Sequence, residues 1–263
     1  MKRGLLTLLE RVAIAWEGLE LWAEHSWRQS APLRTRLAAH GQRINRHPLS
    51  WGTLYVGLFC ALSMLALDRP VAAWLKGVIT GEIEGFFKIV TRLGEAQLYL
   101  IPAGILFLLL MLAAWRAPSP QARARWRQWA VTPGFLFLSI ATSGLISNAI
   151  KTSLGRLRPR YWFEQGLYGF EPFNSHWGMN SFPSGHSQAG FAAMTALMVI
   201  FPRHAALWLS IAVLVAASRV TTTVHWLSDA VAGSWLAICV TILLARWFRA
   251  KGWRVGYSSH SPL

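Results

Sequence analysis

A histidine and an aspartate four residues apart, His225 and Asp229, have side chains and a spacing suited to nucleophilic catalysis. On a helix, residues four apart are neighbours. The carboxylate can then accept one imidazole N–H, which fixes the tautomer, raises the basicity of the ring and leaves the other ring nitrogen free to attack. Arg219 precedes the pair in the same polar segment and supplies a cation. A buried His–Asp pair can also be purely structural.

A second histidine, His186, stands in the run Pro183-Ser184-Gly185-His186 at the start of an apolar stretch. Serine is a residue type that caps helix N-termini, so Ser184 is expected to cap one here. Gly185 lets the backbone approach a ligand closely. A helix N-terminus presents free N–H groups and the positive end of the helix dipole, which suit an anion such as phosphate. The alternative is an ordinary capped turn with an incidental histidine.

Two further cations, Lys151 and Arg158, follow another apolar stretch. They are seven residues apart, about two helical turns, so they could share one face of a helix. Pro159 disfavours helix at the residue before it and predicts that the helix ends at Arg158. Alone, such a cluster is more typical of a basic anchor beside a membrane helix.

Together the three segments supply cations, backbone N–H donors, two histidines and one carboxylate. Phosphoryl transfer needs these parts, because it requires neutralised oxygens, a nucleophile and an acid for the leaving oxygen. No series of carboxylates and no Cys/His cluster indicates a metal site. The two cysteines, Cys60 and Cys239, lie within apolar runs and are interpreted as buried thiols. The sequence therefore favours a route through phosphohistidine with neither metal nor cofactor.

The elements that must position these groups are predicted to lie in a membrane. Hydrophobic residues make up 54% of the chain and charged residues only 14%, whereas a soluble domain carries about a quarter charged residues. Many of the 15 Trp residues stand near the ends of apolar runs, where their rings favour the membrane boundary. The net charge of +15 comes from basic residues between apolar runs. They form no continuous patch, which argues against a nucleic-acid partner.

Six apolar runs predict an all-α fold, a bundle of six transmembrane helices. A membrane span needs about 20 helical residues, and the fourth and fifth runs reach this length only if neighbouring polar residues are helical too. Between the first and second runs, the amphipathic segment Val71–Gln97 is expected to lie along the outer surface or to pack over the bundle. The six runs are Trp51–Leu67, Leu98–Trp115, Trp129–Ile150, Gln188–Phe201, Ala205–Ala217 and Ala230–Trp247.

The distribution of Lys and Arg predicts the orientation. Six spans put both termini on one side, and cytoplasmic termini place 17 of the 26 basic residues inside, as the positive-inside rule requires. The three polar segments then lie at the non-cytoplasmic face. Residues 1–48 are predicted to form an N-terminal extension with an amphipathic helix, either on the membrane surface or packed on the domain. Residues 49–248 form the six-span domain and residues 249–263 a cytoplasmic tail.

The three segments resemble the signature motifs of the phosphatidic acid phosphatase type 2 superfamily. Its first motif is Lys, six residues and Arg-Pro, and its second is Pro-Ser-Gly-His. The third is Ser-Arg, five residues, His, three residues and Asp. The chain matches every position in the same order. One motif alone is a weak signal, whereas the triple match is highly specific and covers roughly residues 50–247.

The resemblance implies a role for each matched residue. His225 would be the nucleophile that forms phosphohistidine, Asp229 would orient it, and His186 would protonate the departing oxygen and then activate water. The other matched residues would hold the phosphate oxygens: Lys151, Arg158, Ser184, the backbone N–H of Gly185, and Arg219.

The resemblance also implies a phosphorylated lipid as the partner and a bacterial inner membrane as the location, with the active site facing the periplasm. Undecaprenyl pyrophosphate is the favoured substrate, and phosphatidylglycerophosphate and lipid A are alternatives. Arg156 and Arg160 could meet a second phosphate or be solvated loop charges. A lipid-to-lipid phosphotransferase would share the first half-reaction. A non-enzymatic lipid transporter or binding protein is the alternative from another class.

Overall fold

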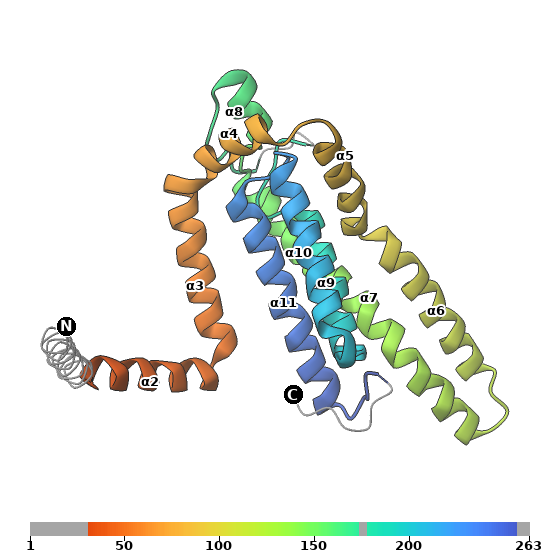
Figure 1. Ribbon diagram of the computed structural model, residues 1–263. Coiled ribbons are helices and arrows are strands. Elements are labelled where there is room, and N and C mark those ends of the chain that lie inside the picture. The colour runs from red at the N-terminus through yellow and green to blue at the C-terminus, as the bar shows by residue number, and fades with distance from the viewer. Residues whose placement is uncertain (1–30, 174–177, 257–263) are drawn as a thin grey trace, which may run out of the picture. The chain divides into compact units, whose positions relative to one another are not determined.

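A computed structural model describes residues 31–173 and 178–256, and these contain helices but no β-strand. The all-α prediction is therefore confirmed for this part of the chain (Figure 1). Two isolated antiparallel bridges join Arg156 with Phe170 and Leu157 with Asn180. The described residues fall into two compact units that divide after Gly52.

The first unit contains α2 (Ala31–Arg46) and the first residues of α3 (Pro48–Leu62). The predicted N-terminal amphipathic helix before residue 31 and the end of the tail after residue 256 lie outside the described residues. The second unit contains the remaining elements, in chain order the rest of α3, the π-helical turn η1 (Ser63–Leu67), α4 (Asp68–Val78), α5 (Gly81–Val90), the 3-10 turn η2 (Thr91–Gly94), α6 (Gln97–Trp115), α7 (Pro120–Leu154), α8 (Pro159–Gln165), α9 (Gly185–Ile200), the 3-10 turn η3 (Pro202–His204), α10 (Ala205–Thr221) and α11 (Leu227–Ala250).

Five helical stretches in the described residues are long and apolar enough to cross a membrane. The fourth predicted run forms α9, whose 16 residues span about 24 Å. A bilayer core is about 30 Å thick, so α9 is too short by itself and the six-span count stays a prediction. The five stretches are Pro48–Val78, Gly81–Trp115, Pro120–Leu154, Pro202–Thr221 and Leu227–Ala250.

The short helix α9 is the centre of the hydrophobic core. A cluster of small and medium side chains joins it to α7, α10 and α11 through Ile140, Ala192, Ala212 and Ala237, all nearly inaccessible to solvent. A helix that is apolar on every side is typically buried by its neighbours. The helix α9 is therefore covered by three neighbouring helices.

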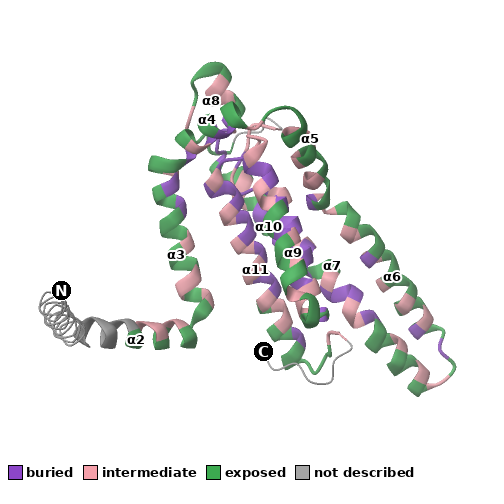
Figure 2. Ribbon diagram, in the orientation of Figure 1, coloured by how far each residue is buried: buried purple, intermediate pink, exposed green. Residues whose placement is uncertain are grey.

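The outer helices α3 and α6 instead expose large apolar side chains, among them Leu58, Leu62 and Leu108. Figure 2 shows this contrast, since α3 and α6 are mostly exposed while buried residues gather on α7 and α11. A soluble monomer rarely exposes apolar patches this extensive. The chain is thus a multi-helix membrane protein whose outer helices present an apolar surface suited to lipid.

The segment predicted to be amphipathic, Val71–Gln97, folds as most of α4, all of α5, the turn η2 and the first residue of α6. Its location along the outer surface stays a prediction. The described residues of the long connection between α7 and α9 contain the short α8 and the two bridges as their regular structure, so their side chains are positioned mainly by tertiary hydrogen bonds.

Candidate active site

The second and third polar segments meet at the N-terminal ends of α9 and α11. The backbone N–H of Ser184 donates to the carbonyl of Asp229 at 3.0 Å. Gly233, one turn further along α11, lies so close that a Cβ on it would be 2.5 Å from the carbonyl oxygen of Ser184. Because that carbonyl is backbone and cannot rotate away, glycine is required at this contact.

The predicted His225–Asp229 pair is present and buried. The Nδ1 atom of His225 lies 3.5 Å from Oδ2 of Asp229. The hydroxyl of Ser181 is closer, at 3.2 Å from Nδ1, and it also donates to Oδ2 of Asp229. The backbone N–H of Trp226 donates to the same carboxylate oxygen at 2.9 Å. A serine hydroxyl therefore lies between the histidine and the aspartate.

His225 is a neutral imidazole in this setting. Burial lowers its pKa to about 3, and the positive charges of Arg158 and Lys151 act in the same direction. Asp229 raises the pKa of the ring, as a neighbouring carboxylate is expected to, but its effect does not outweigh burial. A neutral ring has a lone pair at physiological pH, which is the form a nucleophile requires.

The predicted cations Lys151, Arg158 and Arg219 converge near His186, since all three act electrostatically on its ring. Arg219 is buried and donates from Nη1 to the hydroxyl of Thr91 at 2.6 Å. Its Nε atom has no hydrogen-bond partner among the described residues. A buried N–H of a cation left without an acceptor is available to an anion such as a phosphate oxygen.

Arg158 stays a cation although its pKa is lowered. Burial is the largest cause, and the neighbouring charge of Arg160 adds to it. Its Nε atom donates to the carbonyl of Asn180 at 3.3 Å, which ties the first segment to the stretch before the second.

The prediction that Lys151 and Arg158 share a helix is wrong. The helix α7 ends at Leu154 because Gly155 adopts a left-handed conformation, with φ of 59°. A Cβ there would lie 1.7 Å from the carbonyl oxygen of Glu171. Lys151 therefore belongs to the last turn of α7, while Arg158 caps the separate helix α8.

Arg156 is neither a second-phosphate ligand nor a solvated loop charge, and both of those expectations are wrong. Its side chain is 1% exposed and donates to two carboxylates, from Nη1 to Asp229 at 2.5 Å and from Nη2 to Asp68 at 2.6 Å. It also donates to Ser228 at 2.7 Å and to the hydroxyl of Tyr168 at 3.1 Å. Burial acts to lower the pKa of Arg156, but the two carboxylates together raise it.

The other second-phosphate candidate, Arg160, is exposed. It donates from Nη2 to the hydroxyl of Tyr161 at 2.6 Å, and its guanidinium lies over the same ring.

Ser184 caps α9 as predicted, since its hydroxyl oxygen accepts from the backbone N–H of Ser187 at 3.4 Å. The hydroxyl of Ser187 also donates to it at 3.0 Å, so the proton of Ser184 itself remains for another acceptor. A Cβ added to Gly185 would meet nothing within 4 Å. The first turn of α9 thus combines unpaired N–H groups with open space beside the backbone.

Sequence reasoning missed Asp68, Ser181 and Ser228. The sequence does single out Asp68, because it follows an apolar run directly and the chain has only one other aspartate, Asp229. Ser181 and Ser228 stand within three residues of matched motif positions but carry no recognisable pattern of their own.

The described residues contain no group of three or more His, Cys, Asp or Glu side chains placed to hold a metal. Of the two thiols, Cys60 is buried and lies 3.5 Å from the carbonyl of Ser228, and Cys239 is half-buried.

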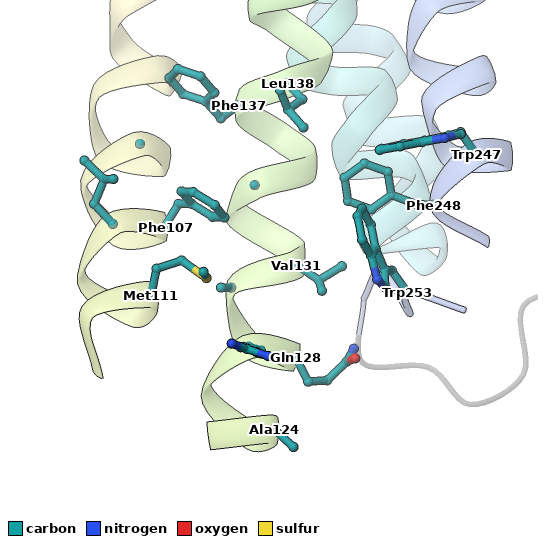
Figure 3. A pocket seen from close by; sticks show the side chains of 15 residues that line it. Phe107, Met111, Ala124, Gln128, Val131, Phe137, Leu138, Trp247, Phe248 and Trp253 are labelled. Carbon is teal, nitrogen blue, oxygen red and sulfur yellow. The ribbon is translucent and has the colours of Figure 1, made fainter. Parts of the chain in front are cut away.

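An apolar pocket of about 800 Å³ lies elsewhere, between α6, α7 and α11 (Figure 3). Phe107, Val131 and Trp253 line it together with Gln128, which is 23 residues before Lys151 on α7. That separation corresponds to about 35 Å of helix. The pocket is therefore distinct from the site built around His225.

Comparisons with known proteins show the family of this chain. The sequence model of the PAP2 superfamily matches residues 133–253, which include all three polar segments. The lipid A 1-phosphatase of Rhizobium etli is 31% identical over 208 residues, covering 76% of this chain and 87% of the relative. The lipid A 1-phosphatase of Rhizobium johnstonii is 30% identical, covering 76% of this chain and 83% of the relative.

A solved structure has the same fold. The transmembrane PAP2-type phosphatidylglycerolphosphate phosphatase of Bacillus subtilis superposes with a TM-score of 0.53 at 20% identity, covering 75% of this chain and 96% of that one. The chain therefore belongs to the PAP2 superfamily, and it is a membrane lipid phosphatase of that superfamily, an enzyme that hydrolyses phosphate esters.

Proposed function

We propose that this protein removes a phosphate from an envelope lipid through a phosphohistidine at His225. The observation that carries the proposal is the buried, neutral ring of His225, whose Nδ1 faces Ser181 and Asp229. The positive charges of Arg158 and Lys151 also act on this ring. A neutral imidazole beside positive charge is suited to attack a phosphorus atom whose oxygens those charges neutralise.

In the first half-reaction, Nε2 of His225 forms a bond to phosphorus as the ester P–O bond breaks. His186 gives a proton to the departing lipid oxygen. In the second, a water oxygen bonds to phosphorus, the N–P bond breaks, and His186 takes a proton from that water, which restores both rings and releases inorganic phosphate. The oxygens of the transferring group are held by Lys151, Arg158, Ser184, the backbone N–H of Gly185, and Arg219.

The substrate we propose is a phosphomonoester of the lipid A type. Two relatives, at 31% and 30% identity, are lipid A 1-phosphatases. The structure also weakens one argument for undecaprenyl pyrophosphate, because Arg156 is occupied by Asp68 and Asp229 and does not face a second phosphate. Undecaprenyl pyrophosphate and phosphatidylglycerophosphate remain the alternative substrates.

The test of the substrate is phosphate release by the purified protein from lipid A, undecaprenyl pyrophosphate, phosphatidylglycerophosphate and phosphatidic acid at equal surface concentration. We expect the highest kcat/KM on lipid A. A higher value on undecaprenyl pyrophosphate would contradict the proposed substrate while leaving the phosphatase chemistry intact. Labelled phosphate that appears on an acceptor lipid, with none released, would instead show a phosphotransferase.

We further propose that the chain crosses a bacterial inner membrane six times, with α9 as the buried sixth crossing, both termini in the cytoplasm and the active site facing the periplasm. The excess of basic residues on the side of the termini supports this orientation.

Cysteine labelling tests this topology in a chain whose own two cysteines are replaced by alanine. A cysteine that replaces Gln165, which is exposed on α8, should react with a maleimide that cannot cross the inner membrane, in cells whose outer membrane alone is permeabilised. A cysteine at Arg123, exposed near the start of α7, should react only after the inner membrane is opened. The reverse pattern would exclude a periplasmic active site.

A further inference from the structure

We propose that Ser181 is a positioning residue of this enzyme, whose hydroxyl links Asp229 to His225 and fixes which ring nitrogen is free to attack. The inference rests on the proposed function of His225 as the nucleophile. Ser181 lies outside all three motifs, three residues before Ser184.

The first argument is distance. Nitrogen and oxygen atoms that share a hydrogen bond are ordinarily about 2.7–3.2 Å apart. His225 Nδ1 is 3.5 Å from the Asp229 carboxylate, beyond that range, and 3.2 Å from the hydroxyl oxygen of Ser181. The shorter path from the ring to the carboxylate therefore passes through Ser181, which has no exposed surface.

The second argument is the number of protons available. An ionised carboxylate only accepts hydrogen bonds, and a hydroxyl has a single proton to donate. Because Ser181 donates that proton to Asp229, its oxygen can only accept from the ring of His225. The proton of the neutral ring is consequently on Nδ1, and the lone pair is on Nε2. The order of donation is His225 to Ser181 to Asp229.

The third argument is that other groups hold both ends of this link. One oxygen of Asp229 accepts from the guanidinium of Arg156, and the other accepts from the backbone N–H of Trp226 and from Ser181. The backbone N–H of Ser181 donates to the carbonyl of Arg156 at 2.6 Å. A single residue, Arg156, thus positions the carboxylate with its side chain and the serine with its main chain.

Loss of the hydroxyl should affect the chemical step but not substrate binding. In Ser181→Ala the ring loses its acceptor and can take either tautomer or turn, so kcat should fall by about 10- to 100-fold, as is usual when the group that orients a functional histidine is removed. KM should stay within about twofold, because Ser181 does not touch the substrate. Ser181→Thr keeps the hydroxyl and should recover most of the lost kcat. The matched control is Ser139→Ala, which removes another fully buried hydroxyl outside the site and should leave kcat unchanged.

A double-mutant cycle with Asp229→Asn separates the link from a general packing role. If Ser181 acts through Asp229, then adding Ser181→Ala to Asp229→Asn should lower kcat by less than about twofold further, because interacting groups are non-additive. Multiplying effects, or a full kcat in Ser181→Ala, would overturn the proposal.

Acid-quenched labelling of the phosphoenzyme distinguishes this failure from failure of the proposed function. A wild-type enzyme that turns over without forming phosphohistidine would refute the function itself. Phosphohistidine that forms at the wild-type rate in Ser181→Ala would refute only the link.

Discussion

Replacing His225 with alanine should abolish phosphate release from every lipid that the wild-type enzyme hydrolyses. The residue supplies the atom that bonds to phosphorus, so its loss removes the reaction path rather than one of its supports. Removal of a nucleophile in a hydrolase that works through a covalent intermediate lowers kcat by about 10⁴- to 10⁶-fold. The measurement is release of labelled phosphate by purified protein, together with acid-quenched labelling of the phosphoenzyme.

The control for this variant is His204→Ala. His204 is exposed at the end of η3 and belongs to none of the three segments, so its replacement should leave kcat unchanged. Full activity in His225→Ala would contradict the phosphohistidine route. Lipid movement across liposomes by this inactive variant, at the wild-type rate, would indicate that the chain also transports lipid.

The variant His186→Ala should behave differently from His225→Ala, because the two histidines have different roles in the proposed reaction. A lipid alkoxide is a poor leaving group and needs the proton of His186, whereas p-nitrophenolate leaves without one. The first half-reaction of p-nitrophenyl phosphate should therefore proceed in His186→Ala and the phosphoenzyme should accumulate. It should not form at all in His225→Ala.

The sequence predicted the parts of this site that depend on local pattern. The spacing of His225 and Asp229 predicted their contact, and the residue type of Ser184 predicted a helix cap. Both features depend on residues close together in the sequence, although His225 precedes the first residue of α11, Leu227, and so does not share a helical turn with Asp229. The convergence of segments more than 40 residues apart followed from the resemblance and is seen in the hydrogen bond from Ser184 to Asp229.

The sequence could not predict the parts that depend on tertiary contacts. Asp68 is 161 residues from Asp229, and no local pattern says that both hold the same arginine. The role predicted for Arg156 was wrong because the nearby cations Arg158 and Arg160 suggested a phosphate site. In the folded chain the side chain of Arg156 instead contacts the carboxylates of Asp68 and Asp229. The end of α7 was misplaced because Pro159 was given more weight than Gly155, whose left-handed conformation ends the helix earlier.

These tertiary contacts form one buried network of charge. Asp68 accepts from Arg156 and also from the backbone N–H and hydroxyl of Ser228, at 3.0 and 2.6 Å. Asp229 accepts from Arg156 on its other side and reaches His225 through Ser181. The arginine thus pairs with two carboxylates that are shielded from water. We therefore expect both stability and catalysis to depend on the same guanidinium.

Arg156→Leu should therefore be strongly destabilising. Removing one partner of a buried ion pair costs about 3–5 kcal/mol, because the charge left behind is neither solvated nor compensated. Here two carboxylates are left behind, and a loss of that size lowers Tm by on the order of 10 °C in a domain of this length. Thermal unfolding in detergent measures the shift, and Arg160→Leu is the matched control, since that arginine is exposed. A Tm in Arg156→Leu equal to that of the control would show that the network contributes no stability.

The charge left behind also predicts a rescue. Asp68→Asn alone keeps the pair between Arg156 and Asp229 and should cost less than Arg156→Leu. Combined with Arg156→Leu, it removes one of the two stranded carboxylates, so the double variant should unfold at a higher temperature than Arg156→Leu alone. A double variant that is more stable than the single variant indicates that two buried like charges repel each other. Losses of packing at separate sites would instead add in the free energy of unfolding and make the double variant less stable. A double variant that is less stable than Arg156→Leu would show that Asp68 acts mainly through its hydrogen bonds to Ser228.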